Sequence, residues 1–163
     1  MKTLYLVGGP MGVGKTAVGQ ELKKRLPGAV FLDGDWCWDM APFVVNAETQ
    51  TMVLENICAL LNNFLRCSVL ENIVFSWVMH RQEIIDTICA RLETPCRVVA
   101  VSLICTEATL RARLQGDIDA GLRTPDVLPR SLERLPLYGA LRTVPIDTTG
   151  KSIREIGAEI SRL

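Results

Sequence analysis

Short runs of apolar residues alternate along the chain with stretches whose apolar residues recur at helical spacing. Nearly unbroken runs rich in Leu, Val and Ile are typical of strands buried on both faces of a parallel sheet. They predict strands over residues 4–7, 29–32, 72–78, 97–104 and 143–146. The helical spacing predicts helices over residues 15–26, 47–65 and 82–92, one after residue 106 and one opening at residue 152. The alternation predicts one α/β domain over residues 1–163, with three layers and a doubly wound, five-stranded parallel sheet.

Capping residues support the predicted helix boundaries. Pro27-Gly28 stops the first helix, and Asn46 and Thr106 stand where N-caps are needed. Ser152 with Glu155 forms a capping-box pattern for the last helix. The stretch from about residue 115 to 141 is different, because three prolines and several arginines interrupt its apolar spacing. We expect this stretch to be a mobile helical lid.

The charge balance excludes some classes of function. The chain has 163 residues, with 18 Lys+Arg and 18 Asp+Glu, so its formal net charge is zero. Dedicated binders of nucleic acid or membrane surfaces normally carry a basic excess, so we expect neither partner. A small anionic ligand needs only a few charges in one place. The apolar run after Met1 is too short for a secretion signal or a membrane span, which favours a cytoplasmic protein.

Six cysteines are the unusual feature of the composition. No two are spaced as C-x-x-C and the chain has one histidine, so the spacing of a zinc site is absent. Most lie in apolar runs, where a thiol behaves as a small hydrophobic group. We interpret them as reduced core residues of a cytosolic protein.

The strongest motif is G-P-M-G-V-G-K-T at residues 9–16, which fits G-x-x-x-x-G-K-[ST] between a predicted strand and a predicted helix. Glycines let the backbone fold into a cradle of N–H groups, and the helix amino terminus adds positive potential. Lys15 is expected to contact the β- and γ-phosphates of a nucleoside triphosphate, and Thr16 to bind Mg²⁺. The predicted nucleotide-binding residues of this phosphate-binding loop (P-loop) are Gly9, Met11, Gly12, Val13, Gly14, Lys15, Thr16 and Ala17.

The rest of the sequence narrows the class of nucleotide-binding protein. No N-K-x-D sequence is present to recognise guanine. The D-x-x-G sequence at residues 147–150 follows the last strand, too late for a GTPase switch. The chain is also short for an ATPase that converts hydrolysis into movement. These features favour a kinase.

Two aspartates follow the second strand, in the sequence F-L-D-G-D at residues 31–35. Ligands of open α/β sheets bind at the carboxyl ends of the strands, so Asp33 and Asp35 are expected beside the P-loop. We expect Asp35 to accept the proton of an attacking hydroxyl and Asp33 to lie on the metal side. The alternative is that both are exposed turn residues, since D-G is a common turn pair.

These two motifs resemble the opening of small P-loop kinases of the nucleoside-monophosphate-kinase fold. Gluconate kinases carry a similar aspartate segment, and shikimate kinases have D-x-D at the same place. The resemblance covers the order of elements over nearly the whole chain and implies the strand order 2-3-1-4-5. It also implies ATP as the phosphoryl donor, Mg²⁺, and a small hydroxylated or phosphorylated acceptor.

The chain departs from both kinase groups on the acceptor side. Gluconate kinases usually follow the aspartates with histidine and proline, where this chain has Trp36-Cys37-Trp38. Shikimate kinases place an arginine and a glycine-rich turn after the third strand, where this chain has Trp77-Val78-Met79-His80-Arg81. The resemblance therefore assigns no acceptor.

Three tryptophans lie just beyond the predicted ends of strands two and three. Trp36, Trp38 and Trp77 are candidate contacts for a flat, partly apolar acceptor such as a nucleoside, sugar or aromatic metabolite, with core packing as the alternative. Arg81 could bind an acceptor carboxylate or phosphate in bidentate fashion, or be an ordinary surface residue. His80 is expected to be a loop residue without a catalytic role.

Arginines after the fourth strand are candidates for the nucleotide side. The sequence L-R-A-R-L at residues 110–114 resembles the stretch that opens the lid in related kinases, which implies that Arg113 lies against adenine. Residues 147–150 resemble the loop that backs the adenine, which places Thr149 there. Arg123 and Arg130 are expected to close over the phosphates and to exclude water. The alternative is a solvated helix face, since acidic residues are interleaved with them.

The sequence thus predicts an ATP-dependent small-molecule kinase that acts on a small acceptor. An antibiotic-modifying phosphotransferase of the chloramphenicol type is a second possibility, because it shares the loop and the fold. A nucleotide-binding switch with slow hydrolysis is a third, and the paired aspartates argue against it. Neither the acceptor nor the oligomeric state can be predicted.

Overall fold

The computed structural model describes residues 1–163 and contains a parallel sheet in the order β2-β3-β1-β4-β5. The strands are β1 (Thr3–Gly8), β2 (Ala29–Asp33), β3 (Asn72–Ser76), β4 (Arg97–Ile104) and β5 (Val144–Asp147). The α-helices are α1 (Lys15–Arg25), α2 (Ala47–Arg66), α3 (Gln82–Ala90), α4 (Glu107–Asp119), α5 (Val127–Arg134) and α6 (Ile153–Ile160). Two 3₁₀ helices are η1 (Gly34–Trp38) and η2 (Leu135–Ala140). The predicted fold class and strand order are confirmed.

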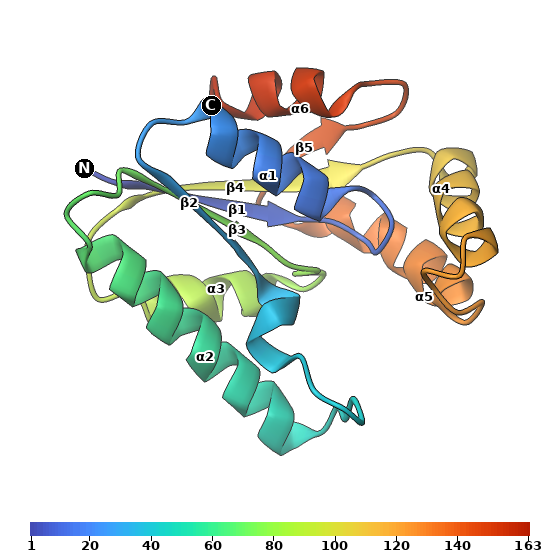
Figure 1. Ribbon diagram of the computed structural model, residues 1–163, viewed down its shortest axis with the longest axis horizontal. Coiled ribbons are helices and arrows are strands. Elements are labelled where there is room, and N and C mark those ends of the chain that lie inside the picture. The colour runs from blue at the N-terminus through green and yellow to red at the C-terminus, as the bar shows by residue number, and fades with distance from the viewer.

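The sheet lies between two helical layers (Figure 1). Helices α1 and α6 cover one face, α2 and α3 cover the other, and α4 and α5 stand beyond the carboxyl end of β4. Successive residues of β1 enter different cores, because side chains alternate across a strand. Leu4 and Leu6 pack with Ile57 of α2, whereas Tyr5 and Val7 pack with residues of α1 and α6.

Most predicted boundaries match the structure within two or three residues. The caps at Asn46, Thr106 and Ser152 are all present, and Ser152 forms its capping box with Glu155. The third strand is shorter than predicted and ends at Ser76 rather than at residue 78. The Trp77 amide still donates to the Val7 carbonyl of β1 at 3.2 Å, and beyond it the buried Met79 has a φ of 37°. The residues around Met79 line the pocket described below.

The predicted lid is mostly helical. Helix α4 extends to Asp119, and α5 and η2 follow. Leu110, Leu114 and Val127 form a small apolar core between α4 and α5. None of the helices of the chain is long and apolar enough to cross a membrane.

The cysteines only partly fit the prediction that they fill the core. All six thiols are free. Cys37 and Cys58 are buried and three others are half-buried, but Cys67 is exposed. Cys67 lies at the carboxyl end of α2, where the chain leaves the apolar face of that helix. Burial raises the pKa of Cys37 to about 11, with a further contribution from Asp33, so this thiol stays protonated at neutral pH.

Candidate active site

The P-loop lies between β1 and α1, at the carboxyl edge of the sheet. Gly14 is the N-cap of α1 and has a φ of 106°, and no side chain satisfies the first N–H groups of the helix. These groups therefore remain available to a phosphate. The Lys15 ammonium donates a hydrogen bond to the carbonyl of Pro10 at 3.0 Å, within the same loop.

Gly12 is required at its position in the loop. Its φ is 86°, and a Cβ atom there would lie 2.5 Å from Cδ2 of Leu114, which is fully buried. We expect Gly12→Ala to destabilise the fold by about 2–4 kcal/mol, from backbone strain and overpacking. Thermal unfolding should reveal this as a drop in Tm of roughly 5–12 °C. Gly116→Ala in α4 is the matched control, because a Cβ there meets no atom within 4 Å. An unchanged Tm for Gly12→Ala would contradict the interpretation.

Asp33 connects the P-loop to the residues after β2. One of its carboxylate oxygens accepts a hydrogen bond from Thr16 Oγ1 at 2.7 Å, and the other accepts from the Asp35 amide at 3.0 Å. Asp33 is paired with Ser76 in the sheet register, and the buried Ser76 hydroxyl has no hydrogen-bond partner. Hydroxyl and carboxylate oxygens are ligands that Mg²⁺ prefers, so this cluster fits the predicted metal side of a nucleotide site.

Burial lowers the pKa of Lys15 to about 8, while the carboxylates of Asp35 and Asp33 oppose this shift. Arg123 and Arg134 add to the lowering. Burial thus removes the ammonium from water, and a bound anion would stabilise its charged form.

Asp35 lies at the start of η1, with part of its side chain open to solvent. Desolvation by its surroundings raises the pKa of the carboxyl, and neighbouring Asp33 raises it further. Lys15 and the indoles of Trp77 and Trp38 act in the opposite direction. A carboxylate with a raised pKa is a better proton acceptor than an ordinary aspartate.

A pocket of about 330 Å³ opens beside Asp35. Met11 of the P-loop, Trp38 and Trp77 also line it, so two of the three predicted tryptophan contacts are brought together. Trp36 is not among the lining residues. Its ring packs edge-to-face on Phe31, with centroids 5.5 Å apart, and 57% of the residue is exposed. Side chains at positions 36 and 38 of the tight η1 turn thus have different surroundings.

Four basic side chains also line this pocket: His80, Arg81, Arg130 and Arg134. Nδ1 of His80 is buried without a hydrogen-bond partner. Burial lowers the pKa of His80, and the charges of Arg134 and Arg81 lower it further, so the imidazole is neutral at physiological pH. Neither Arg81 nor Arg134 forms an ion pair with a carboxylate. Both guanidinium groups are therefore free to meet an anion.

The two arginines predicted to close over the phosphates are each paired with an aspartate. Arg123 contacts Asp117 at 3.0 Å, and Arg130 contacts Asp126 at 3.0 Å. Both line a second, open cavity with Met11 of the P-loop. Arg134 was not a candidate from the sequence, although its charge lowers the pKa of both Lys15 and His80. Its spacing of four residues from Arg130, which places both on one face of a helix, is the signal that could have identified it.

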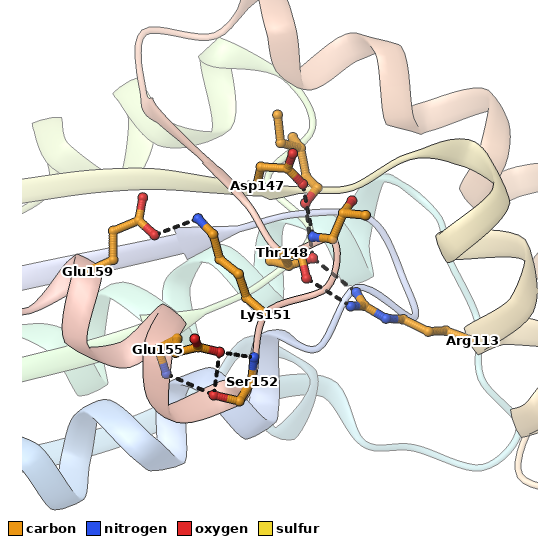
Figure 2. Close-up of polar contacts among 9 residues, drawn as sticks. Arg113, Asp147, Thr148, Lys151, Ser152, Glu155 and Glu159 are labelled. Carbon is orange, nitrogen blue, oxygen red and sulfur yellow. Dashed lines mark hydrogen bonds and ion pairs between the residues drawn. The ribbon is translucent and has the colours of Figure 1, made fainter.

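Arg113 joins three distant segments of the chain, and Figure 2 shows its contact with Thr148 in the loop after β5. Its guanidinium donates to the Val13 carbonyl at 3.1 Å, to Thr148 Oγ1 at 3.0 Å and to the Thr148 carbonyl at 3.2 Å. The loop after β5 is further held by Asp147, which accepts from the Thr149 amide, and by Thr149 Oγ1, which accepts from the Thr106 amide. The predicted adenine-side residues are thus close together beside the P-loop.

Two hydrogen bonds that the sequence did not predict attach the lid to the P-loop and to the turn after β3. The buried Ser131 hydroxyl donates to the Met11 carbonyl at 2.6 Å. The Tyr138 hydroxyl donates to the Val78 carbonyl at 2.6 Å, and the amide of Gly9 donates to the same oxygen at 3.4 Å. Val78 also lines the pocket, so one peptide group connects the P-loop, the lid and the pocket wall.

Known structures share this fold. A gluconokinase from Sinorhizobium meliloti 1021 is 23% identical, with a TM-score of 0.71 over 97% of this chain and 89% of that one. A shikimate kinase from Acinetobacter baumannii, in complex with shikimate, is 22% identical, with a TM-score of 0.66 over 99% and 92%. A tunicamycin resistance protein from Deinococcus radiodurans is 17% identical, with a TM-score of 0.72 over 99% and 95%.

Comparisons of sequence alone find one protein family. No curated protein matches the chain. The family model of the AAA domain matches residues 6–122, which include the P-loop, both aspartates and all of α4. With the P-loop and the strand order of the small kinases in place, the chain belongs to the AAA domain family and has the fold of the small P-loop kinases.

Proposed function

We propose that the protein is an ATP-dependent kinase that transfers the γ-phosphate of ATP to a hydroxyl or phosphate group of a small acceptor. The main support is that a single pocket borders both the P-loop, through Met11, and Asp35. A phosphoryl donor held by the loop and an acceptor in the pocket would then meet beside one carboxylate. Phosphoryl transfer requires mainly such positioning and the neutralisation of charge.

On the donor side, the P-loop amides and Lys15 would hold the phosphates. Thr16 and Asp33 would hold Mg²⁺, which neutralises charge on the phosphate oxygens when it is bound. Arg113 and Thr149 would border the adenine. Arg123 and Arg130, together with Arg134, would contact the transferred group and exclude water.

On the acceptor side, Asp35 would accept the proton of the attacking hydroxyl. The hydroxyl oxygen forms a bond to the γ-phosphorus, the bond from that phosphorus to the β–γ bridging oxygen breaks, and ADP leaves with that oxygen. Arg81 would bind an anionic group of the acceptor, if it carries one. Trp38 and Trp77 would contact the body of the acceptor, and Trp36, outside the pocket, would contribute less.

The test is the rate of ATP consumption with and without a mixture of metabolites that carry hydroxyl groups. A kinase should hydrolyse ATP slowly alone and consume it faster with its acceptor, and the product should carry phosphate by mass spectrometry. A nucleotide-binding switch would respond to a protein partner and not to metabolites. Consumption that never depends on a small molecule would refute the proposal.

ATP affinity should depend on pH through Lys15. The pKa of about 8 means that the free protein carries a charged Lys15 below about pH 8 and loses that charge above it. Because the charged form binds phosphate, affinity should be full near pH 7 and fall on the order of tenfold by about pH 9. Isothermal titration with a non-hydrolysable ATP analogue measures this. The same titration of Lys15→Met should lack this fall, and a wild-type affinity that does not change would contradict the assignment.

A further inference from the structure

The pocket beside Asp35 is mostly apolar. Ten of its sixteen lining residues are hydrophobic. Its volume of about 330 Å³ is in the range of cavities that hold small organic ligands. A polyhydroxylated acid would leave most of these walls unmatched, because its hydroxyl groups need hydrogen-bond partners that apolar walls do not supply. The lining therefore favours an acceptor with an apolar body.

Aromatic rings dominate one part of this lining. Trp38 packs edge-to-face against Phe43, with ring centroids 5.0 Å apart, and against Trp77, with centroids 5.9 Å apart. These three residues come from η1, the segment after it and the turn after β3. Aromatic rings pack on one another in edge-to-face or offset geometry, so this cluster can extend to a ring of the ligand.

The backbone holds Trp77 in this position. A Cβ atom at Gly34 would lie 2.5 Å from Cγ of Trp77, so the absence of a side chain there lets the indole lie directly against η1. Close packing on η1 restricts the Trp77 side chain, and a restricted contact surface lowers the entropic cost of binding.

Two exposed apolar side chains lie at the rim of the pocket, among polar ones. Phe43 is 59% exposed and Val45 is 53% exposed, yet both line the pocket. Apolar surface that a ligand removes from water favours binding roughly in proportion to its area. An acceptor with an apolar ring would cover these side chains, whereas a polar acceptor would gain little from them.

The geometry points to a hydroxylated aromatic compound as the acceptor, with its ring against Trp38, Trp77 and Phe43 and its hydroxyl at Asp35. This inference rests on the proposed function, and the transfer step is the one given there. A nucleoside and a simple aryl alcohol share this chemistry, and the experiment separates them.

The first experiment compares affinities by isothermal titration of the intact protein, saturated with a non-hydrolysable ATP analogue and Mg²⁺. The aromatic probes are adenosine, chloramphenicol and 2-phenylethanol, and the polar probes are gluconate and shikimate. We expect at least one aromatic probe to bind on the order of tenfold more tightly than both polar probes. Adenosine as the best probe would identify a nucleoside, and either of the others an aryl alcohol.

The second experiment changes the rim. Phe43→Ser should weaken the best aromatic probe roughly three- to tenfold and leave the affinity for the ATP analogue unchanged. Val69→Ser is the matched control, since Val69 is 76% exposed and lies outside the pocket. Both variants should keep the wild-type Tm, because the side chains that they truncate are largely exposed.

The outcomes separate this inference from the proposed function. Tighter binding of gluconate or shikimate than of every aromatic probe would overturn the aromatic acceptor and leave a kinase. Binding of the ATP analogue with no binding of any aromatic probe would also overturn it. If Phe43→Ser and Val69→Ser changed the affinity for the best aromatic probe equally, Phe43 would not contact the ligand. That result would overturn the proposed ring contact. Failure of the ATP analogue itself to bind would refute the proposed function.

Discussion

Lys15→Met should lower kcat for phosphoryl transfer by roughly a hundredfold to a thousandfold or more, without unfolding the protein. Lys15 is the cation of the P-loop, and its side chain lies within that loop, beside the Pro10 carbonyl. Removing a charge that stabilises the transferred group costs most in the transition state, where charge redistributes over the phosphate oxygens. The measurement is steady-state kinetics with the acceptor found by screening.

The thermal stability of Lys15→Met should not fall with its activity. Burial disfavours the charged form of Lys15, as its pKa of about 8 indicates, so a methionine of similar length should keep or raise the Tm. Lys23→Met is the matched control, because Lys23 is exposed on the same helix, and it should keep full activity. A Lys15→Met variant that transfers phosphate at the wild-type rate would exclude the proposed role of the loop.

Asp35→Asn should lower kcat by about 10²- to 10⁴-fold and change the affinity for ATP by less than about twofold. Asparagine keeps the shape of the side chain but cannot accept a proton. The raised pKa of Asp35 also predicts the acidic limb of the pH–rate profile. Activity should fall as the pH drops through that raised value, at a higher pH than an ordinary aspartate would give, because protonated Asp35 is no longer a base.

Asp39→Asn is the control for this variant. Asp39 is exposed just after η1 and does not line the pocket, so its change should leave kcat unaltered. If Asp35→Asn reduced ATP affinity and turnover equally, Asp35 would belong to the metal side with Asp33. Direct measurement of ATP binding, separately from kcat, distinguishes the two roles.

The fold could be predicted largely because its signals are local. The uninterrupted apolar run of β3, the helical spacing of α2 and the capping box at Ser152 each specify an element within a short window. The P-loop sequence fixes its own position between β1 and α1, since only a strand-to-helix connection suits it. One boundary shifted at the end of β3, which stops at Ser76, three residues before the positive φ of Met79.

The site was less predictable because its residues depend on packing between segments far apart in the chain. Arg123, Arg130 and Arg134 look alike in sequence, but the first two have aspartate partners and Arg134 has none. Ser131 and Tyr138 looked like ordinary lid residues, although both are buried and donate to carbonyls of other segments. Trp36 and Trp38 differ by two positions, and only the turn of η1 decides which one lines the pocket.

The shared carbonyl of Val78 has a consequence for cooperativity. It accepts from Gly9 in the P-loop and from Tyr138 in the lid, and Val78 itself borders the pocket. A nucleotide that moves the P-loop would also shift the Val78 peptide group, which borders the acceptor pocket. The nucleotide and the acceptor should therefore not bind independently. Thermodynamic reciprocity then requires each to alter the affinity of the other by the same factor. Tyr138→Phe, which removes one of the two donors, should reduce that coupling.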